Sequence, residues 1–409
     1  MVMATDNSEQ LSCSQVRNVL ASKQIGTSDL ITEIPQVVSG EPKGICTSSK
    51  TCCLAKMEDH LVSAVKKDFL SLVQATSSYL KNLIATNTVK LQESLMTTLR
   101  MAETNTVNLF TTLYSKMAPA ASSSVTRLFT RLSAFIQGKD VDVEEGVANF
   151  FDSLFPLVYH HSLNPKLTEF SDDYKDCLRV IRVELHPFGD GPRRVGAQLS
   201  RVLHSARALL DALRLGVEVL NSTEHADVAT ECSSALVRLL YCPLCDPNAV
   251  SSPSLANAIK DTRACNGFCM NVLRGCLANV ADLDDPWNEY VKALESLAAS
   301  AGAKGALTVD DVTATLPTRI SEAIMHAMVN GPELTKNVKK KCGHPQRSTR
   351  DVAVDPSSMQ SSNLSLVPSE VVSSASPAVV HSDLAVHLQS FIHGLSQSKG
   401  FYANLADTL

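Results

Sequence analysis

The 409-residue sequence lacks several features that mark membrane-embedded proteins and common enzymes. No stretch approaches the roughly 20 consecutive apolar residues of a membrane-spanning helix, and residues 1–11 contain no apolar run of signal-peptide length. The motifs G-x-S-x-G and H-E-x-x-H, the P-loop and the dinucleotide fingerprint are also missing. A literal interpretation is therefore a soluble cytosolic protein that is not an enzyme.

The excess of acidic over basic residues is small, and aromatic side chains are few. The formal net charge is −5, and aromatic residues make up 5% of the chain, with a single tryptophan, Trp287. No global field therefore draws the protein onto nucleic acid or anionic lipid. The basic run from Lys339 to Lys341 is typical of a solvated helix end. Apolar residues account for 44%, which allows a sizeable buried core.

Neither glycine nor proline occurs between Ile45 and Ala118. Because these residues most often interrupt helices, their absence favours a long uninterrupted helix. Apolar residues recur mostly three or four positions apart, at Leu61, Val65, Phe69, Leu72, Leu80, Ile84, Leu91, Leu95, Leu99 and Met101. A helix from 57 to 117 would be about 90 Å long. Thr88 and Asn105 are candidate weak points, and the alternative is two antiparallel helices with an unmarked turn.

The rest of the chain predicts further helices and no convincing strand, so the predicted fold class is all-α. The expected helices span 144–159, 168–185, 195–220, 228–241, 264–280, 286–299 and 309–329. Residues 343–377 are rich in Ser, Pro and Val without helical periodicity, which is typical of a linker. A short amphipathic segment at 384–395 follows it.

The sequence contains 12 cysteines, a number compatible with six disulfides, a metal site or free thiols. Cys242 and Cys245 form one short-spaced pair, and Cys265 and Cys269 form another after a 19-residue spacer. Two such pairs could hold a tetrahedral zinc ion. Alternatively, Cys265, Cys269 and Cys276 could form one stripe on a helix face. Spacing alone leaves zinc and disulfides both open.

The run Cys265-Asn-Gly-Phe-Cys269-Met-Asn-Val-Leu-Arg-Gly-Cys276 resembles the signature of the glypican family. The resemblance extends from residue 13 to 343. Matching blocks are Cys13-Ser-Gln-Val-Arg17, Gly44-Ile-Cys46, Thr51-Cys-Cys53, Pro187-Phe-Gly-Asp-Gly-Pro192, Asp282-Leu-Asp284, Trp287-Asn288, Ile320-Ser-Glu-Ala-Ile-Met325 and Cys342-Gly343. The pattern is more similar to the Dally-like branch than to the Dally branch. The 19-residue spacer between Cys245 and Cys265 is longer than the usual spacer of the family. We expect it to be a surface-loop insertion.

The resemblance implies an elongated, disulfide-bonded helical cylinder with an N-terminal cysteine-rich lobe. The implied glypican core covers residues 12–343, its cysteine-rich lobe includes 13–53 and 232–276, and a central helical body completes it. A Ser/Pro-rich linker at 344–380 and the start of a truncated C-terminal helical segment at 381–409 are expected to follow. The implied disulfides are Cys13–Cys52, Cys46–Cys242, Cys53–Cys245, Cys177–Cys342 and Cys232–Cys276.

Cys265 and Cys269 would pair with cysteines of a later segment and are therefore expected to be unpaired here. Disulfides require an oxidising compartment, so we expect this sequence to be a fragment without its signal peptide and anchor signal. Arg347-Ser-Thr-Arg350 fits the R-x-x-R pattern of furin-like convertases. Asn221 and Asn363 begin N-glycosylation sequons. No catalytic residue, metal ligand or cofactor is expected, and heparan sulfate would be attached outside this sequence.

The expected function is that of the core protein of a cell-surface heparan sulfate proteoglycan. Such a core acts as a co-receptor or modulator for Wnt, Hedgehog, BMP and FGF signalling proteins and their receptors. The expected location is the extracellular side of the plasma membrane through a GPI lipid anchor absent from this chain, with shed or matrix forms as well. Nucleic acid is not an expected partner. The alternative is an intracellular helical adaptor with a structural zinc site.

Overall fold

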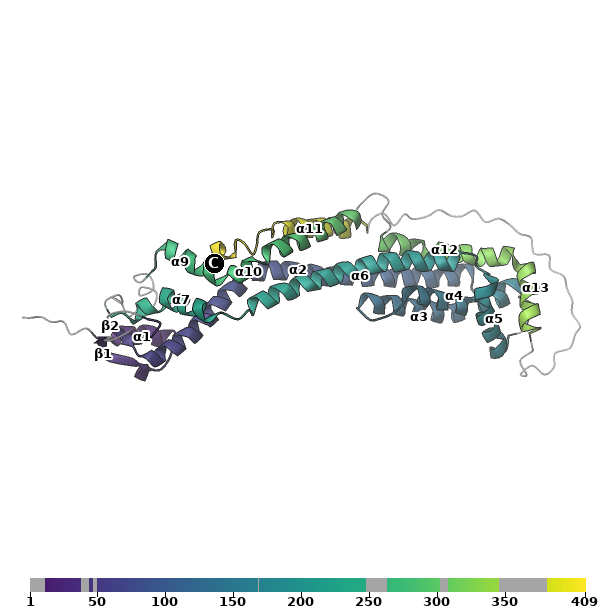
Figure 1. The fold of residues 1–409 in the computed structure, drawn as a ribbon. Helices are drawn as coiled ribbons and strands as arrows, with labels where there is room; N and C mark the ends of the chain where they lie inside the picture. Colours follow the sequence, from purple (N-terminus) through teal and green to yellow (C-terminus); the bar gives the residue numbers. More distant parts are fainter. Residues whose placement is uncertain are drawn as a thin grey trace, which may run out of the picture. The chain divides into compact units, whose positions relative to one another are not determined.

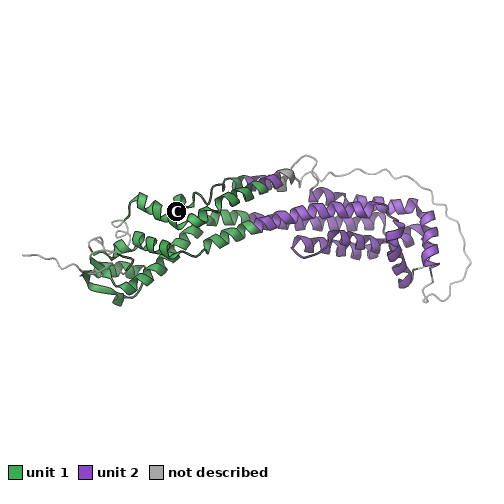
Figure 2. Ribbon diagram, in the orientation of Figure 1, with its two compact units in different colours: residues 1–85, 215–293, 393–409 green, residues 86–214, 294–392 purple. Residues whose placement is uncertain are grey.

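A computed structural model describes residues 12–37, 44–46, 50–167, 169–247, 263–301, 308–345 and 381–409. Its chain forms two compact units, each assembled from separate stretches of sequence (Figure 2). Unit 1 comprises Met1–Ala85, Leu215–Ala293 and His393–Leu409, and unit 2 comprises Thr86–Arg214 and Leu294–Ile392. Helices make up most of both units, which confirms the all-α fold class (Figure 1). In the described stretches, no helix combines the length and apolar character needed to cross a membrane.

Unit 1 contains a two-stranded antiparallel sheet and several short helices. The strands are β1 (Ile31–Val37) and β2 (Lys50–Cys53), paired from Ile31 opposite Cys53 to Val37 opposite Lys50. The helical elements that lie wholly in this unit are α1 (Ser14–Ser22), η1 (Ser28–Leu30), α7 (Thr230–Leu240), η3 (Cys242–Cys245), α9 (Asn266–Cys276), α10 (Ala278–Ala281) and α15 (Leu405–Thr408).

Unit 2 is built from longer helices. They are α3 (Ala118–Ile136), α4 (Val143–Val158), the π-helical turn η2 (Tyr159–Leu163), α5 (Asp172–Leu185), α12 (Val309–Val329) and α13 (Gly331–Cys342). Four helices contribute residues to both units: α2 (Ala55–Leu113), α6 (Gly191–Glu224), α11 (Asp284–Ala301) and α14 (His381–Ser396). Helix α4 packs against both α3 and α5, and α5 also packs against α13.

Helix α2 is continuous over 59 residues. Neither Thr88 nor Asn105 interrupts it, so the alternative of two antiparallel helices is wrong. Its buried positions keep the three-and-four spacing, as at Leu61, Val65 and Phe69. Thr88 itself is buried, which shows that packing tolerates a polar β-branched residue inside this helix.

Several helix starts are fixed by capping side chains. The Ser171 hydroxyl accepts a hydrogen bond from the Tyr174 N–H, so α5 begins at Asp172 rather than at the expected residue 168. A reciprocal capping box joins Thr308 and Asp311 at the start of α12. The predicted start at residue 309 is confirmed there.

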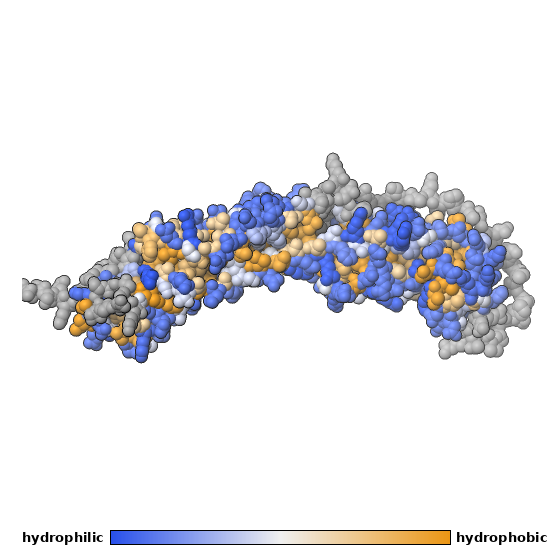
Figure 3. Space-filling model, viewed as in Figure 1, coloured by the Kyte–Doolittle hydropathy of each residue, from blue (hydrophilic) through white to orange (hydrophobic). Residues whose placement is uncertain are grey.

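Each unit has its own hydrophobic core. In unit 2 the core fills the space between the helices with fully buried aromatic side chains such as Phe129, Phe151 and Phe155. In unit 1 it gathers around cysteines and aliphatic side chains, including Cys13, Leu20 and Leu61. On the face shown in Figure 3, hydrophilic residues predominate and are interrupted by separate hydrophobic patches.

Three features of the fold are absent from the sequence-based expectations. The two strands were missed because β2 has only four residues and β1 contains Pro35, so neither shows clear alternation. Helices α1, α3 and α13 were not assigned either. The expected single helix at 264–280 is instead α9 and α10, with the break at Leu277.

Candidate functional site

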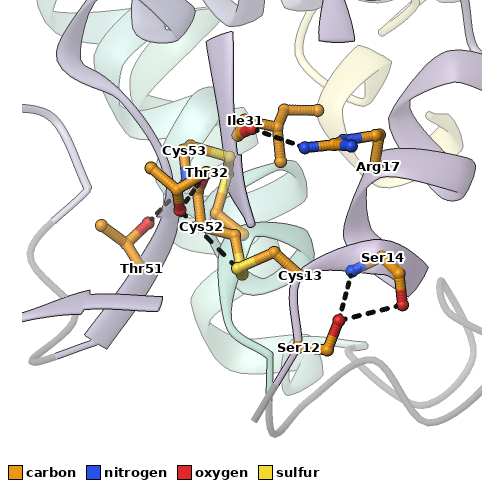
Figure 4. Close-up of a disulfide and its surroundings, with 10 residues drawn as sticks. Ser12, Cys13, Ser14, Arg17, Ile31, Thr32, Thr51, Cys52 and Cys53 are labelled. Carbon is orange, nitrogen blue, oxygen red and sulfur yellow. Dashed lines mark hydrogen bonds between the residues drawn. A yellow bond between two sulfur atoms is a disulfide. The ribbon is translucent and has the colours of Figure 1, made fainter. Parts of the chain in front are cut away.

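The first disulfide, Cys13–Cys52, fastens the start of α1 to β2 (Figure 4). The two Cα atoms are 5.6 Å apart. Around the bond, the Cys13 N–H donates to the Glu33 carbonyl at 3.1 Å, and the Thr32 hydroxyl donates to the Cys52 carbonyl at 3.3 Å. The hydrogen bonds and the disulfide therefore join α1, β1 and β2 into one small assembly.

Two further disulfides tie this assembly to the short turn η3. Cys46 bonds Cys242 and Cys53 bonds Cys245, across sequence separations of 196 and 192 residues. Bonds between residues so far apart restrict the unfolded chain strongly and typically stabilise by about 2–4 kcal/mol each. The turn from Cys242 to Cys245 is therefore bonded covalently to residues that lie about 190 positions earlier in the chain.

Tyr241 supports this turn through a polar contact with α2. Its hydroxyl donates to Asp68 at 2.6 Å, and the Lys23 ammonium lies 3.1 Å from the same carboxylate. Burial acts to raise the pKa of Asp68, but the hydrogen bonds from Tyr241 and Lys23 outweigh it and hold that pKa below its usual value. Burial and the neighbouring Asp68 carboxylate raise the pKa of Tyr241, so its hydroxyl remains a donor.

The remaining disulfides lie one in each unit. Cys177–Cys342 connects α5 to the end of α13 in unit 2, and Cys232–Cys276 connects α7 to the end of α9 in unit 1. The five pairs found are those that the resemblance to glypicans implies.

The structure does not form the tetrahedral zinc site considered for Cys242, Cys245, Cys265 and Cys269. The sulfurs of Cys242 and Cys245 are already bonded to Cys46 and Cys53. In the described part of the chain, no cluster of three or more His, Cys, Asp or Glu side chains could hold a metal ion. The alternative of a structural zinc site is therefore wrong for these residues.

Cys265 and Cys269 form no disulfide with any described cysteine. Cys265 is exposed at the N-cap of α9, and Cys269 is half-buried one turn later, where its N–H donates to the Cys265 carbonyl at 3.1 Å. Both thiols therefore lie at the beginning of one helix. Cys276, at its other end, is bonded to Cys232.

The modification sites fall partly outside the described residues. Arg347, Arg350 and Asn363 lie there, as does the expected insertion loop at 248–262. Asn221 is exposed in the last turn of α6. Its sequon partner Thr223 is buried, and the Thr223 hydroxyl lies 3.0 Å from the Val219 carbonyl and 3.2 Å from the Tyr402 hydroxyl.

Unit 2 also contains a groove of about 1130 Å³ that sequence reasoning missed. Its floor is one face of α4, and α3 and α5 form its sides. Both cationic and acidic side chains line it, and Lys175 and Glu169 form an ion pair at 3.3 Å. His160 and His161 lie in η2, directly after α4, and burial, followed by the neighbouring His160 and Lys116, lowers the pKa of His161. The spacing of small residues on α4, Gly146 and Ser153, is the signal that could have revealed this open face.

Comparisons with known proteins agree on one family. The sequence pattern of the glypican family matches residues 1–409. Mouse glypican-5 is 36% identical over 401 residues, which are 97% of this chain and 66% of that protein. The chain thus spans just under two thirds of the length of this relative.

Solved structures show the same fold. A crystal structure of C-terminally truncated glypican-1 matches with a TM-score of 0.70 and 25% identity, covering 98% of this chain and 83% of that one. A structure of Dally-like protein in complex with O-palmitoleoyl serine matches with a TM-score of 0.59, 21% identity, and coverage of 98% and 82%. At this identity the second likeness establishes the fold alone, and membership of the Dally-like branch stays a prediction.

Proposed function

This chain belongs to the glypican family, and from that membership we propose that it is the core of a non-enzymatic heparan sulfate proteoglycan at the cell surface. The observation that carries the proposal is the match of the family pattern to residues 1–409. The five disulfides support it, because a framework of this density forms and persists in an oxidising, extracytoplasmic compartment.

The full gene product would carry the heparan sulfate chains and a GPI lipid anchor outside the 409 residues. It would act as a co-receptor or modulator for Wnt, Hedgehog, BMP and FGF proteins. Sulfated chains attract basic ligands electrostatically and raise their local concentration, and this attraction weakens as salt rises. The protein core would add contacts of its own.

Processing belongs to the same proposal. A convertase would cleave after Arg350, and N-linked glycans would be added at Asn221 and Asn363. The buried Thr223 of the first sequon means that glycosylation at Asn221 would have to precede folding of the end of α6. Peptide mass spectrometry of the secreted protein identifies both events directly.

The test uses the full-length gene product expressed on animal cells. We expect heparinase to reduce its apparent mass, and a phosphatidylinositol-specific phospholipase to release it from the surface. Binding of a basic growth factor of the FGF class should fall after heparinase and with rising salt. A cytosolic product without glycosaminoglycan would contradict the proposal.

A further inference from the structure

Helix α13 gathers positive charge on a chain whose formal net charge is −5. The helix contains four lysines and one acidic residue. Lys341 pairs with Glu184 of α5. The other three lysines are exposed, and none of them forms an ion pair with a carboxylate in the described part of the chain. We call these three residues, Lys336, Lys339 and Lys340, the lysine face of α13.

Helix periodicity places the lysine face on one side of α13. Lys336 is three residues before Lys339 and four before Lys340, and residues at these spacings lie side by side, with Cβ atoms about 5–6 Å apart. The opposite side of the helix is packed into the core of unit 2, where Leu334 and Val338 are buried. The lysine face therefore points to solvent.

The end of α13 is fixed to α5 by covalent and hydrogen bonds. Cys342 is bonded to Cys177. The Tyr174 hydroxyl donates to the Gly343 carbonyl at 3.5 Å, and the Gly343 N–H donates to the Lys339 carbonyl at 3.1 Å. A ligand that binds to the lysine face therefore has to order the lysine side chains but not the backbone that carries them.

The stability of the helix accounts for only part of this arrangement. Lys339 and Lys340 lie in the last turn of α13, where cations interact favourably with the helix dipole. Lys336 lies before that turn, where the effect of the dipole has fallen off. Like charges three or four residues apart repel each other and destabilise a helix slightly. A bound polyanion would remove this repulsion.

A sulfated polysaccharide fits the lysine face better than other polyanions do. Single-stranded nucleic acid is bound by cations together with aromatic side chains on which the bases stack, and α13 contains no aromatic residue. Helices that lie on anionic membranes insert an exposed apolar face, whereas Leu334 and Val338 of α13 are buried. A chain with closely spaced sulfate groups needs only exposed cations, because it is attracted by charge alone.

We propose that the lysine face of α13 binds a sulfated glycosaminoglycan chain carried by another molecule. The three ammonium groups pair with sulfate groups along the chain. Release of the counterions condensed on the polyanion makes the affinity fall as salt rises. The extracellular setting of this binding rests on the proposed function, whereas the affinity of the 409-residue chain can be measured whatever its natural location.

The experiment uses the full 409-residue chain, secreted through an added signal peptide from cells that cannot synthesise glycosaminoglycans. The probe is a heparin oligosaccharide of uniform length, and its dissociation constant is measured by calorimetry at several salt concentrations. The test variant is Lys336→Gln/Lys339→Gln/Lys340→Gln. We expect it to raise the dissociation constant about tenfold at low salt, because each exposed charge pair contributes modestly. The slope of log Kd against log salt should become shallower by about two to three.

The matched control is Lys56→Gln/Lys67→Gln/Lys90→Gln. It removes the same amount of charge from three exposed lysines that are dispersed along α2. We expect this control to leave the dissociation constant unchanged, because the three positions do not share one face at short range. Circular dichroism verifies that both variants fold.

Two further measurements locate the contact. Lysines are acetylated with and without the heparin oligosaccharide and mapped by mass spectrometry, and we expect protection of the lysine face but not of the three control lysines on α2. The variant Lys336→Arg/Lys339→Arg/Lys340→Arg keeps the charge and should retain the affinity of the parent. This variant separates loss of charge from any disturbance of α13.

Equal weakening by the test variant and its control would overturn the proposal, because binding would then follow overall charge. Loss of binding in Arg347→Gln/Arg350→Gln, with binding kept in the lysine variant, would also overturn it. So would equal affinity for heparin and for phosphatidylserine vesicles, duplex DNA or unsulfated hyaluronan. A full-length gene product that stays in the cytosol would contradict the proposed function and would leave the measured affinity for heparin as it is.

Discussion

At the scale of single residues, a largely buried ion pair joins Lys81 and Glu224 inside unit 1. Glu224 is 3% exposed, accepts a hydrogen bond from the Ser77 hydroxyl and pairs with the Lys81 ammonium, both at 2.5 Å. A carboxylate this deeply buried depends on its partners, because removing one of them leaves an uncompensated charge.

Replacing Lys81 with Met should therefore destabilise unit 1 by about 3 kcal/mol in chemical denaturation. The double variant Lys81→Met/Glu224→Leu should recover much of this loss, because it removes both charges. The exposed pair of Arg319 and Glu322, 3.1 Å apart, is the matched control, and Arg319→Ala should cost less than about 1 kcal/mol. Equal costs for Lys81→Met and Arg319→Ala would show that Glu224 does not depend on Lys81.

A second prediction concerns Asp68 and acid. Its pKa in the folded protein lies below the ordinary value of 3.8, so the contacts with Tyr241 and Lys23 contribute stability above that pH. This contribution is lost as the pH falls through the lowered pKa. Asp68→Asn should thus destabilise the protein slightly at neutral pH, and the difference from the parent should vanish in acid. Asp59→Asn, on the exposed face of the same helix, is the control, and denaturant midpoints across pH provide the measurement.

The roles of residues that bond to distant parts of the chain could not be predicted from local sequence patterns. Spacing alone left zinc and disulfides both open for Cys242 and Cys245, and only the resemblance to a family supplied a pairing. The partners lie about 190 residues away, and no local pattern encodes such a distance. The hydrogen bond from Trp287 to Ser398 could not be predicted for the same reason, because the two residues are 111 positions apart.

At the scale of elements, local periodicity was the strongest guide. The stretch without glycine or proline gave one helix from Ala55 to Leu113, close to the predicted 57–117. Strand β2 could not be predicted in this way because its two last residues, Cys52 and Cys53, are held by disulfides to distant segments. Apolar periodicity predicts helices such as α2, whose own residues mark a buried face. It does not predict elements such as β2, which depend on bonds to distant segments.

The continuity of α2 gives a direct test. Thr88→Pro should cost about 3 kcal/mol or more and reduce the helical circular dichroism signal, because it removes a backbone hydrogen bond in mid-helix. Lys56→Pro, in the first turn of the same helix, is the control and should be tolerated. If Thr88→Pro were harmless, the chain would have to turn near that residue.

Helix α9 and its N-cap contain one disulfide-bonded cysteine and two unpaired ones, so the effects of replacing each kind on stability can be compared. Replacing Cys232 and Cys276 together with Ser should destabilise unit 1 by about 2–4 kcal/mol, because the link between α7 and α9 is lost. Replacing Cys265 and Cys269 with Ser should change the denaturant midpoint little, because neither forms a disulfide in this structure. The reverse order of effects would mean that the bonds are assigned to the wrong cysteines.

At the scale of the whole molecule, family membership was predictable and the composition of the units was not. The matching blocks from Cys13 to Gly343 identified the family. Periodicity gave no indication that residues 393–409 join residues 1–85 and 215–293 in one unit. That arrangement depends on long-range contacts of α6, α9 and α11 with the last residues of the chain.

We proposed above that this glypican-family chain is an extracytoplasmic core held by five disulfides. The most direct test of this proposal is disulfide mapping by mass spectrometry of the 409-residue chain secreted from cells, after alkylation of free thiols without reduction. We predict alkylation at Cys265 and Cys269 alone and cross-linked peptides for the other ten cysteines in the five pairs observed. Alkylation of Cys242 and Cys245, or zinc bound to them, would contradict the account.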